Sequence, residues 1–142
     1  MNPKELIKEA FLAREKSYSP YSNFSVGAAL LASNGQIYQG CNIESASYTP
    51  TNCAERTAFF KAVSEGITSF EAIAIVGGKK EEPVDFCSPC GVCRQVMMEF
   101  CDPKSFKVIL AKSEEEYKEF TLEEILPLGF GPKNMQDNSA ID

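Results

Sequence analysis

The sequence predicts an α/β fold, in which one sheet lies between helix layers as a three-layer α-β-α sandwich. Helical and strand patterns follow one another in the order α-β-β-α-β-α-β, with a weaker fifth strand near the end. The 142 residues, 44 % of them hydrophobic, are sufficient to fill one core without disulfides. The chain has no internal repeat and no linker that would divide it. We therefore assign residues 1–132 to a single domain and expect residues 133–142 to form a polar, flexible C-terminal tail.

The first third of the chain predicts a helix and then a β-hairpin. The helix begins near Pro3, which suits the first helical position, because Asn2 can cap it and apolar residues follow at helical spacing. Small and branched residues over 24–32 predict a buried strand. Asn34-Gly35 is a strong hairpin signal, so residues 36–42 are expected to return as the partner strand.

The rest of the chain predicts two helices that each begin beside a cysteine. We expect one helix from about Cys53 to Glu65, capped by Asn52, and another from about Pro89 to Phe100, capped by Ser88. The remaining expected elements are a strand at 70–76, a solvated loop at 77–83, a strand at 106–111, a weaker strand near 117–120, and a short helix that starts with a capping box at Thr121 and stops at Pro127.

Composition excludes several classes of function. The net charge of −6 disfavours polymeric nucleic acid and anionic lipid surfaces as ligands. No stretch approaches the roughly 20 apolar residues of a membrane span, and the N-terminus lacks the apolar core of a signal peptide. We therefore expect a cytoplasmic protein. There is no histidine, so histidine-based catalysis is excluded and any transition-metal site must use sulfur and carboxylate ligands.

Three of the six cysteines are spaced as metal ligands. Cys53 lies at the start of one predicted helix, and Cys90 and Cys93 lie three apart at the start of another. A helix N-terminus favours the thiolate over the thiol. Three thiolates can occupy three corners of a zinc tetrahedron and leave the fourth open. Taken alone, Cys53 would be interpreted as a small buried residue, and the Cys-x-x-Cys pair would fit either zinc or redox chemistry.

Cys87 leaves two alternatives open. The run from Cys87 through Cys90 to Cys93 also begins a bacterial iron–sulfur pattern, although no fourth cysteine follows at the expected short spacing. Cys87 could instead complete a closed structural site of four cysteines. We expect the other two cysteines, Cys41 and Cys101, to be core residues.

Glu55 and Arg56 follow the first cysteine closely. Glu55 lies three residues after Asn52, where a glutamate often caps a helix. Residues two apart do not share a helix face, so Glu55 is not expected to bind a metal beside Cys53, but it can flank a water molecule held there. A zinc ion with three thiolates carries a formal charge of −1, and Arg56 is the best-placed cation to offset that charge, with Arg94 second.

These residues match a known signature. Cys53-Ala54-Glu55 followed by Pro89-Cys90-Gly91-Val92-Cys93 resembles the motif of zinc-dependent nucleoside and nucleobase deaminases, with cysteine in place of histidine as the first ligand. Residues 24–30, 40–44, 53–58 and 126–132 are similar to the small homotetrameric cytidine deaminases. The resemblance covers roughly residues 3 to 132, and it implies a mixed, mostly five-stranded sheet with helices on both faces.

The resemblance implies a role for each matching position. It implies one zinc ion per subunit, with Cys53, Cys90 and Cys93 as ligands and Glu55 as the catalytic proton shuttle. It also implies a substrate site in which Phe24 packs against the nucleoside, Asn42 and Glu44 bind the ribose hydroxyls, and the backbone at Ala54 reads the base. In a homotetramer, neighbouring subunits would add Ala46, Tyr48 and Phe130.

The implied reaction is the hydrolysis of cytidine and 2′-deoxycytidine to uridine and 2′-deoxyuridine, with release of ammonia, in pyrimidine salvage. One alternative is an aminonucleoside-antibiotic deaminase of the same superfamily, although residues 42–48 look more like the cytidine enzymes. A nucleic-acid editor is disfavoured by the acidic charge. A non-catalytic structural zinc module with a closed four-cysteine site is the last alternative.

Overall fold

The sheet runs through the middle of the molecule and has the mixed, five-stranded form that the family resemblance implies. The computed structural model describes residues 1–136. The strands lie in the order β2-β1-β3-β4-β5, and only the pair β3–β4 is parallel. Their bounds are β1 (Phe24–Ala32), β2 (Ile37–Cys41), β3 (Phe70–Lys79), β4 (Lys107–Ala111) and β5 (Tyr117–Thr121).

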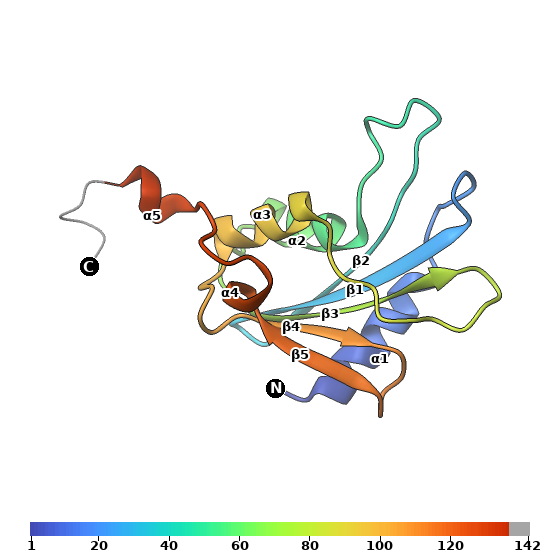
Figure 1. The fold of residues 1–142 in the computed structure, drawn as a ribbon, viewed down its shortest axis with the longest axis horizontal. Helices are drawn as coiled ribbons and strands as arrows, with labels where there is room; N and C mark the ends of the chain where they lie inside the picture. Colours follow the sequence, from blue (N-terminus) through green and yellow to red (C-terminus); the bar gives the residue numbers. More distant parts are fainter. Residues whose placement is uncertain (137–142) are drawn as a thin grey trace.

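Helices cover both faces of this sheet, so the three-layer sandwich is confirmed (Figure 1). Helix α1 (Pro3–Arg14) packs on one face, and helices α2 (Ala54–Ser64) and α3 (Gly91–Phe100) pack on the other. Two short helices, α4 (Leu122–Ile125) and α5 (Pro132–Met135), follow the last strand. The layer under α2 and α3 contains four packed phenylalanine rings, those of Phe59, Phe70, Phe100 and Phe106.

Local sequence signals give several element boundaries correctly. The side chain of Asn2 caps α1 by accepting a hydrogen bond from the Lys4 amide at 3.1 Å. The predicted capping box is present at α4, where the side chains of Thr121 and Glu124 each accept from the other's backbone amide. Strand β1 has the predicted bounds. These elements depend on contacts between near neighbours in the chain, which is why pattern alone locates them.

The prediction of a solvated loop beginning at Gly77 is wrong. Strand β3 continues through Gly77 and Gly78 to Lys79, and both glycines are buried and paired with the start of β1. A Cβ atom at Gly77 would lie 2.9 Å from the Cys87 sulfur. The glycine at this position allows another part of the chain to approach the strand closely, and does not break the strand.

The structure describes only part of the expected C-terminal tail. Residues 132–135 form α5, which the sequence did not predict, and residues 137–142 lie outside the described residues. Within the described part of the chain, no helix has both the length and the apolar character needed to cross a bilayer.

Candidate metal centre

Two helix N-termini bring the three predicted cysteines together. Cys53 is itself the N-cap of α2, and Cys90 is the N-cap of α3, each with extended backbone angles. The predicted caps, Asn52 and Ser88, are therefore wrong by one and two residues. Neither cysteine side chain is used in a capping hydrogen bond, so both sulfur atoms remain available beside the free amides of a helix end.

The spacing of the sulfur atoms fits a tetrahedral metal. The Cys53 and Cys90 sulfurs are 3.7 Å apart, and the Cys90 and Cys93 sulfurs are 3.5 Å apart. Zinc–sulfur bonds of about 2.3 Å in a tetrahedron place two sulfurs about 3.8 Å apart. Among the described residues, these three cysteines form the one group of potential ligands whose donor atoms all lie within 4.8 Å of one another. The cluster is compatible with one zinc ion.

A glycine in β2 determines how closely α2 approaches the sheet. A Cβ atom at Gly40 would lie 2.4 Å from the Ala54 carbonyl oxygen and 2.5 Å from the Ala58 amide nitrogen. Both of these atoms belong to the first turns of α2, next to Cys53 and Glu55. The absence of a side chain at Gly40 therefore allows the helix end that carries the site to rest directly on the strand.

Arg56 balances negative charge at the cysteines. Its Nη2 donates to the Cys53 sulfur at 3.3 Å. Hydrogen bonds from the Cys93 thiol and from Arg56 hold the pKa of Cys53 well below its ordinary value, and the same sharing raises the pKa of Cys93. The weaker candidate, Arg94, instead donates to the carbonyls of Pro89 at 2.8 Å and Ile125 at 2.6 Å. The Cys53 sulfur therefore has a guanidinium beside it, which favours its thiolate form.

Glu55 is the one charged residue among the buried residues of the described chain, with 4 % of its surface exposed. Burial raises its pKa to about 7, and the charge on Cys53 acts in the same direction, whereas its own backbone amide and Cys93 act against it. Glu55 does not reach back to the Asn52 amide as a capping residue would, because that amide donates to the Ile43 carbonyl at 2.9 Å. A carboxyl group with a pKa near 7 can both accept and donate a proton at neutral pH.

Cys87 lies outside the three-sulfur group. Its side chain packs against Gly77, and burial raises the pKa of its thiol to about 11. Among residues 1–136, the four-cysteine arrangement considered from the sequence is thus not formed. Cys101 is a core residue as expected, whereas Cys41 is only half-buried.

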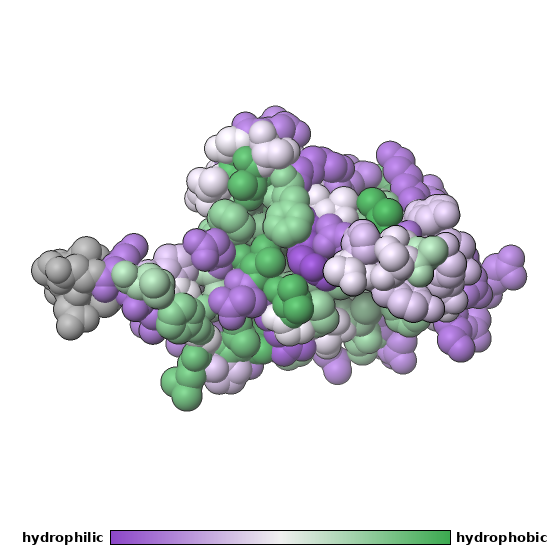
Figure 2. All heavy atoms as spheres, turned by 90° about the horizontal axis from the view of Figure 1, so that it is seen from above, coloured by the Kyte–Doolittle hydropathy of each residue, from purple (hydrophilic) through white to green (hydrophobic). Residues whose placement is uncertain are grey.

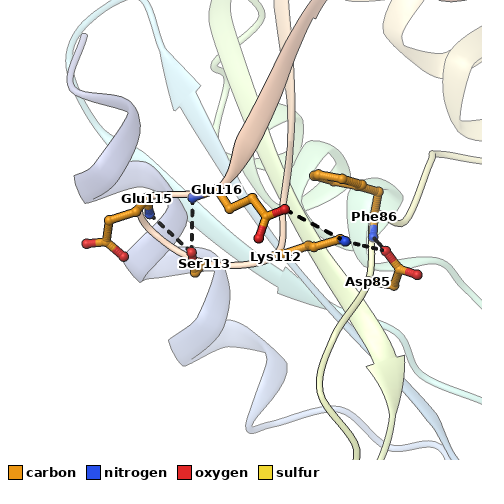
Figure 3. A network of polar contacts seen from close by, with 6 residues as sticks. All are labelled: Asp85, Phe86, Lys112, Ser113, Glu115 and Glu116. Carbon is orange, nitrogen blue, oxygen red and sulfur yellow. Dashed lines mark hydrogen bonds and ion pairs between the residues drawn. The ribbon is translucent and has the colours of Figure 1, made fainter.

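The segment before Cys90 is tied to the turn between β4 and β5 (Figure 3). The Phe86 ring lies under two ammonium groups, with its centroid 4.8 Å from Lys112 Nζ and 4.5 Å from Lys118 Nζ. Lys112 also pairs with Asp85 at 3.5 Å and with Glu116 at 3.8 Å. Cation–π contacts of this kind contribute about 0.5–1 kcal/mol each at exposed sites. They connect the approach to Cys90 with the far edge of the sheet.

A short β-bridge places the predicted sugar-binding residues next to the cysteines. Ile43 and Asn52 exchange both backbone hydrogen bonds, at 2.9 and 3.0 Å. Asn42 and Glu44 flank Ile43, and Asn52 directly precedes Cys53. The bridge thus brings together two regions that sequence analysis could connect only through the family resemblance.

Several contacts link the predicted substrate residues. Asn42 Nδ2 donates to the Phe24 carbonyl at 2.8 Å. Glu44 accepts from the backbone amides of Tyr21 and Ser22 at 3.0 and 3.1 Å and from the Ser22 hydroxyl. The Ser22 hydroxyl also lowers the pKa of Glu44, followed by the two amides. A cavity of about 280 Å³ opens beside Glu44, and its lining comprises Tyr21, Ser22, Glu44, Ser45, Tyr48 and Thr51.

The cavity includes Glu44 and Tyr48 but none of the three cysteines. Ala54 is buried in the first turn of α2. The residues expected to serve a neighbouring subunit, Ala46, Tyr48 and Phe130, all lie exposed at the surface. Sequence analysis missed Ser22, which lies between the first predicted helix and the strand at 24–32 and belongs to no recognised motif. The one local signal is the bond from the Phe24 amide to the Ser22 hydroxyl at 3.1 Å, a turn that serine commonly forms.

Comparison with known proteins agrees with this geometry. The model of the cytidine and deoxycytidylate deaminase zinc-binding region matches residues 1–109. The cytidine deaminase of Sporosarcina psychrophila is 52 % identical over 135 residues, covering 95 % of this chain and 96 % of the relative. That of Halalkalibacterium halodurans is also 52 % identical, covering 96 % and 100 %.

Solved structures show the same similarity. The crystal structure of cytidine deaminase from Burkholderia pseudomallei superposes with a TM-score of 0.82 at 44 % identity, covering 92 % of this chain and 100 % of the other. That of the Mycobacterium tuberculosis enzyme superposes with a TM-score of 0.78 at 33 % identity, covering 92 % and 98 %.

Proposed function

This chain belongs to the cytidine and deoxycytidylate deaminase family, and from that premise we propose the roles of its individual residues in the deamination of a free cytosine nucleoside. The reaction is the hydrolytic replacement of the amino group of cytidine or 2′-deoxycytidine by oxygen, with release of ammonia. The observation that carries the assignment of roles is a three-sulfur cluster beside a buried glutamate whose pKa is near neutral.

Cys53, Cys90 and Cys93 hold the zinc ion. When bound, zinc lowers the pKa of a water molecule from about 15.7 to near 7. Glu55 accepts a proton from the attacking water and delivers it to N3 of the pyrimidine ring. It then takes the second proton from the hydroxyl added at C4 and gives it to the departing amine, so that C4 becomes a carbonyl and ammonia leaves. General acid–base help of this kind contributes typically about 10²–10⁴-fold to the rate. Arg56, in contact with Cys53, offsets the negative charge of the thiolates.

The nucleoside is held by residues around the Ile43–Asn52 bridge. Asn42 and Glu44 bind the sugar hydroxyls, the backbone at Ala54 reads the base, and Phe24, which is 37 % exposed, packs against the nucleoside. A carboxylate accepts hydroxyl protons and an amide both donates and accepts, which suits a sugar with several hydroxyls. A nucleoside is therefore favoured over a free base.

Exposed apolar side chains support assembly into a homotetramer with shared sites. Figure 2 shows apolar side chains gathered across the middle of the face that carries α2 and α3. Tyr48, Leu128 and Phe130 are 75 %, 102 % and 56 % exposed, and the first two have positive φ angles of 63° and 57°. Left-handed backbone at bulky residues is unfavourable, and such positions cluster at functional sites. In our proposal, Ala46, Tyr48 and Phe130 enter the site of a neighbouring subunit.

The proposed function is tested by incubating the purified protein with cytidine and measuring uridine and ammonia. We expect stoichiometric products, loss of turnover after zinc is removed by a chelator, and recovery when zinc returns. The same assay with an aminonucleoside antibiotic separates the alternative specificity. A zinc-loaded protein that leaves cytidine unchanged would overturn the proposal. All six cysteines are free of disulfides, which agrees with a reducing, cytoplasmic compartment.

A further inference from the structure

The hydroxyl of Ser22 connects two of the proposed substrate-binding residues. It donates its proton to Glu44 Oε2 and accepts the Phe24 amide proton at 3.1 Å. A serine hydroxyl has a single proton, so its donation to the carboxylate commits it and leaves only lone pairs for other partners. The hydrogen bonds therefore run in one direction, from the Phe24 amide through Ser22 to Glu44.

The other side of Phe24 is tied to Asn42. The Phe24 carbonyl accepts from Asn42 Nδ2 at 2.8 Å. Asn42 Oδ1 accepts from the Val26 amide at 2.9 Å and from the Ser17 hydroxyl at 2.5 Å. One continuous set of hydrogen bonds thus connects Asn42, Phe24 and Glu44 before any substrate arrives.

Glu44 depends more on the Ser22 hydroxyl than Asn42 depends on the Ser17 hydroxyl. Asn42 retains two backbone partners without Ser17. Glu44 Oε1 has two backbone donors, the amides of Tyr21 and Ser22, but Oε2 has only the Ser22 hydroxyl among the described residues. The backbone bonds hold Oε1 in place and the Ser22 hydroxyl holds Oε2, so without the hydroxyl the carboxylate could pivot about Oε1.

We infer that Ser22 is a positioning residue that holds the Glu44 carboxylate in the orientation required to accept the sugar hydroxyls of the nucleoside. The inference rests on the proposed function and deepens it, because it assigns the specificity for a hydroxylated sugar to a preorganised pair instead of to Glu44 alone. A polar group fixed before binding loses less conformational freedom when the ligand arrives.

The test compares two substrates across matched variants. Ser22→Ala removes the hydroxyl, Ser22→Thr keeps it, and Ser33→Ala removes an exposed hydroxyl that bonds only the Ser69 hydroxyl elsewhere on the surface. Each zinc-loaded variant is assayed with cytidine and with 2′,3′-dideoxycytidine, which has the same base but lacks both hydroxyls that Glu44 and Asn42 are proposed to bind.

We expect Ser22→Ala to lower kcat/KM for cytidine about tenfold, mainly through KM, because a hydrogen bond to a charged group is disturbed. Its kcat/KM for the dideoxy substrate should stay within about twofold of the wild-type value, since no hydroxyl is present to be read. Ser22→Thr and Ser33→Ala should match the wild type on both substrates.

Three results would overturn the inference. An equal fall with both substrates would mean that Ser22→Ala damages the site generally, and unchanged kinetics with cytidine would mean that Ser22 positions nothing. A wild-type enzyme that turns over cytidine but prefers it no more than the dideoxy compound would overturn the sugar-reading role of Glu44 and the inference with it. A zinc-loaded wild type that is inactive with cytidine would be a failure of the proposed function itself.

Discussion

Replacing Glu55 with glutamine should abolish catalysis and, in the metal-free protein, also remove a pH-dependent loss of stability. Glu55 is buried with 4 % exposure, and burial raises its pKa from 4.5 to about 7. Because the folded-state pKa lies above the unfolded-state value, the native state binds this proton more tightly. The resulting contribution to stability is fully present below pH 4.5 and is lost as the pH rises through 7.

The size of this effect follows from the shift. At about 1.4 kcal/mol per pKa unit, a change from 4.5 to about 7 corresponds to about 3 kcal/mol of unfolding free energy. Glutamine does not ionise, so the unfolding free energy of Glu55→Gln lacks this fall with pH. Cys53 also titrates in the metal-free protein, with a lowered pKa and the opposite sign. It does so in both proteins, so the difference between the two stability curves reports Glu55 and its coupling to Cys53.

The assay is urea unfolding of both metal-free proteins between pH 4.5 and 8. We expect the wild type to lose about 3 kcal/mol relative to Glu55→Gln over that range. Glu71→Gln, a change at an exposed carboxylate on β3, controls for the loss of one negative charge. After zinc is restored, Glu55→Gln should bind one zinc per chain and show at least about 100-fold lower kcat, equivalent to about 3 kcal/mol of barrier. Parallel stability curves would mean that the carboxylate is solvated, and an active zinc-loaded variant would refute its role in proton transfer.

Three further changes test how the centre is held. Gly40→Ala should lower zinc content and thermal stability, because the added methyl group displaces the start of α2. The control Gly91→Ala should keep the stability of the folded protein, because no atom lies within 4 Å of its added Cβ. Equal unfolding temperatures for the two variants would contradict this prediction. Cys87→Ser should retain one zinc per chain by elemental analysis, and release of zinc would favour a four-cysteine site. Phe86→Leu should speed zinc transfer to a chelator several-fold, because it removes the ring contacts with two lysines that restrain the segment before Cys90. An unchanged transfer rate would show that these contacts do not restrain Cys90.

The three-cysteine cluster could be predicted because its sequence signals are local. Two lie three apart at the start of one helix, and the third begins another helix with a similar polar lead-in. The caps could not be predicted from residue type alone. Asn52 is a good cap by composition, but its backbone pairs with Ile43 and its side chain donates to Thr57 at 3.3 Å. Those contacts move the helix start to Cys53.

Long-range partners account for the other differences between sequence and structure. The Ser22 hydroxyl meets Glu44, which lies 22 residues away in the chain, and no periodicity encodes that meeting. Gly77 resembles a loop residue until Cys87 packs against it. In both cases the residue type is locally ambiguous, and the approach of a distant segment decides its role.

The metal centre and the proposed sugar-binding residues are both attached to β2. Changes on either side of this strand can therefore test the two parts of the site separately. Gly40 lies under the start of α2 and so determines the position of Cys53 and Glu55, which in our proposal act on the base. The chain that leaves β2 carries Asn42 and Glu44, which in our proposal bind the sugar, and the loop at Ser22 orients Glu44. A change under α2 should therefore reduce turnover of cytidine and of 2′,3′-dideoxycytidine by the same factor.

A change in the loop at Ser22 should reduce only the turnover of cytidine. If Gly40→Ala and Ser22→Ala gave the same ratio between the two substrates, the metal centre and the sugar site would be mechanically one unit. The β-bridge between Ile43 and Asn52 would then transmit each disturbance to the other side, instead of simply holding two independently positioned sites next to each other.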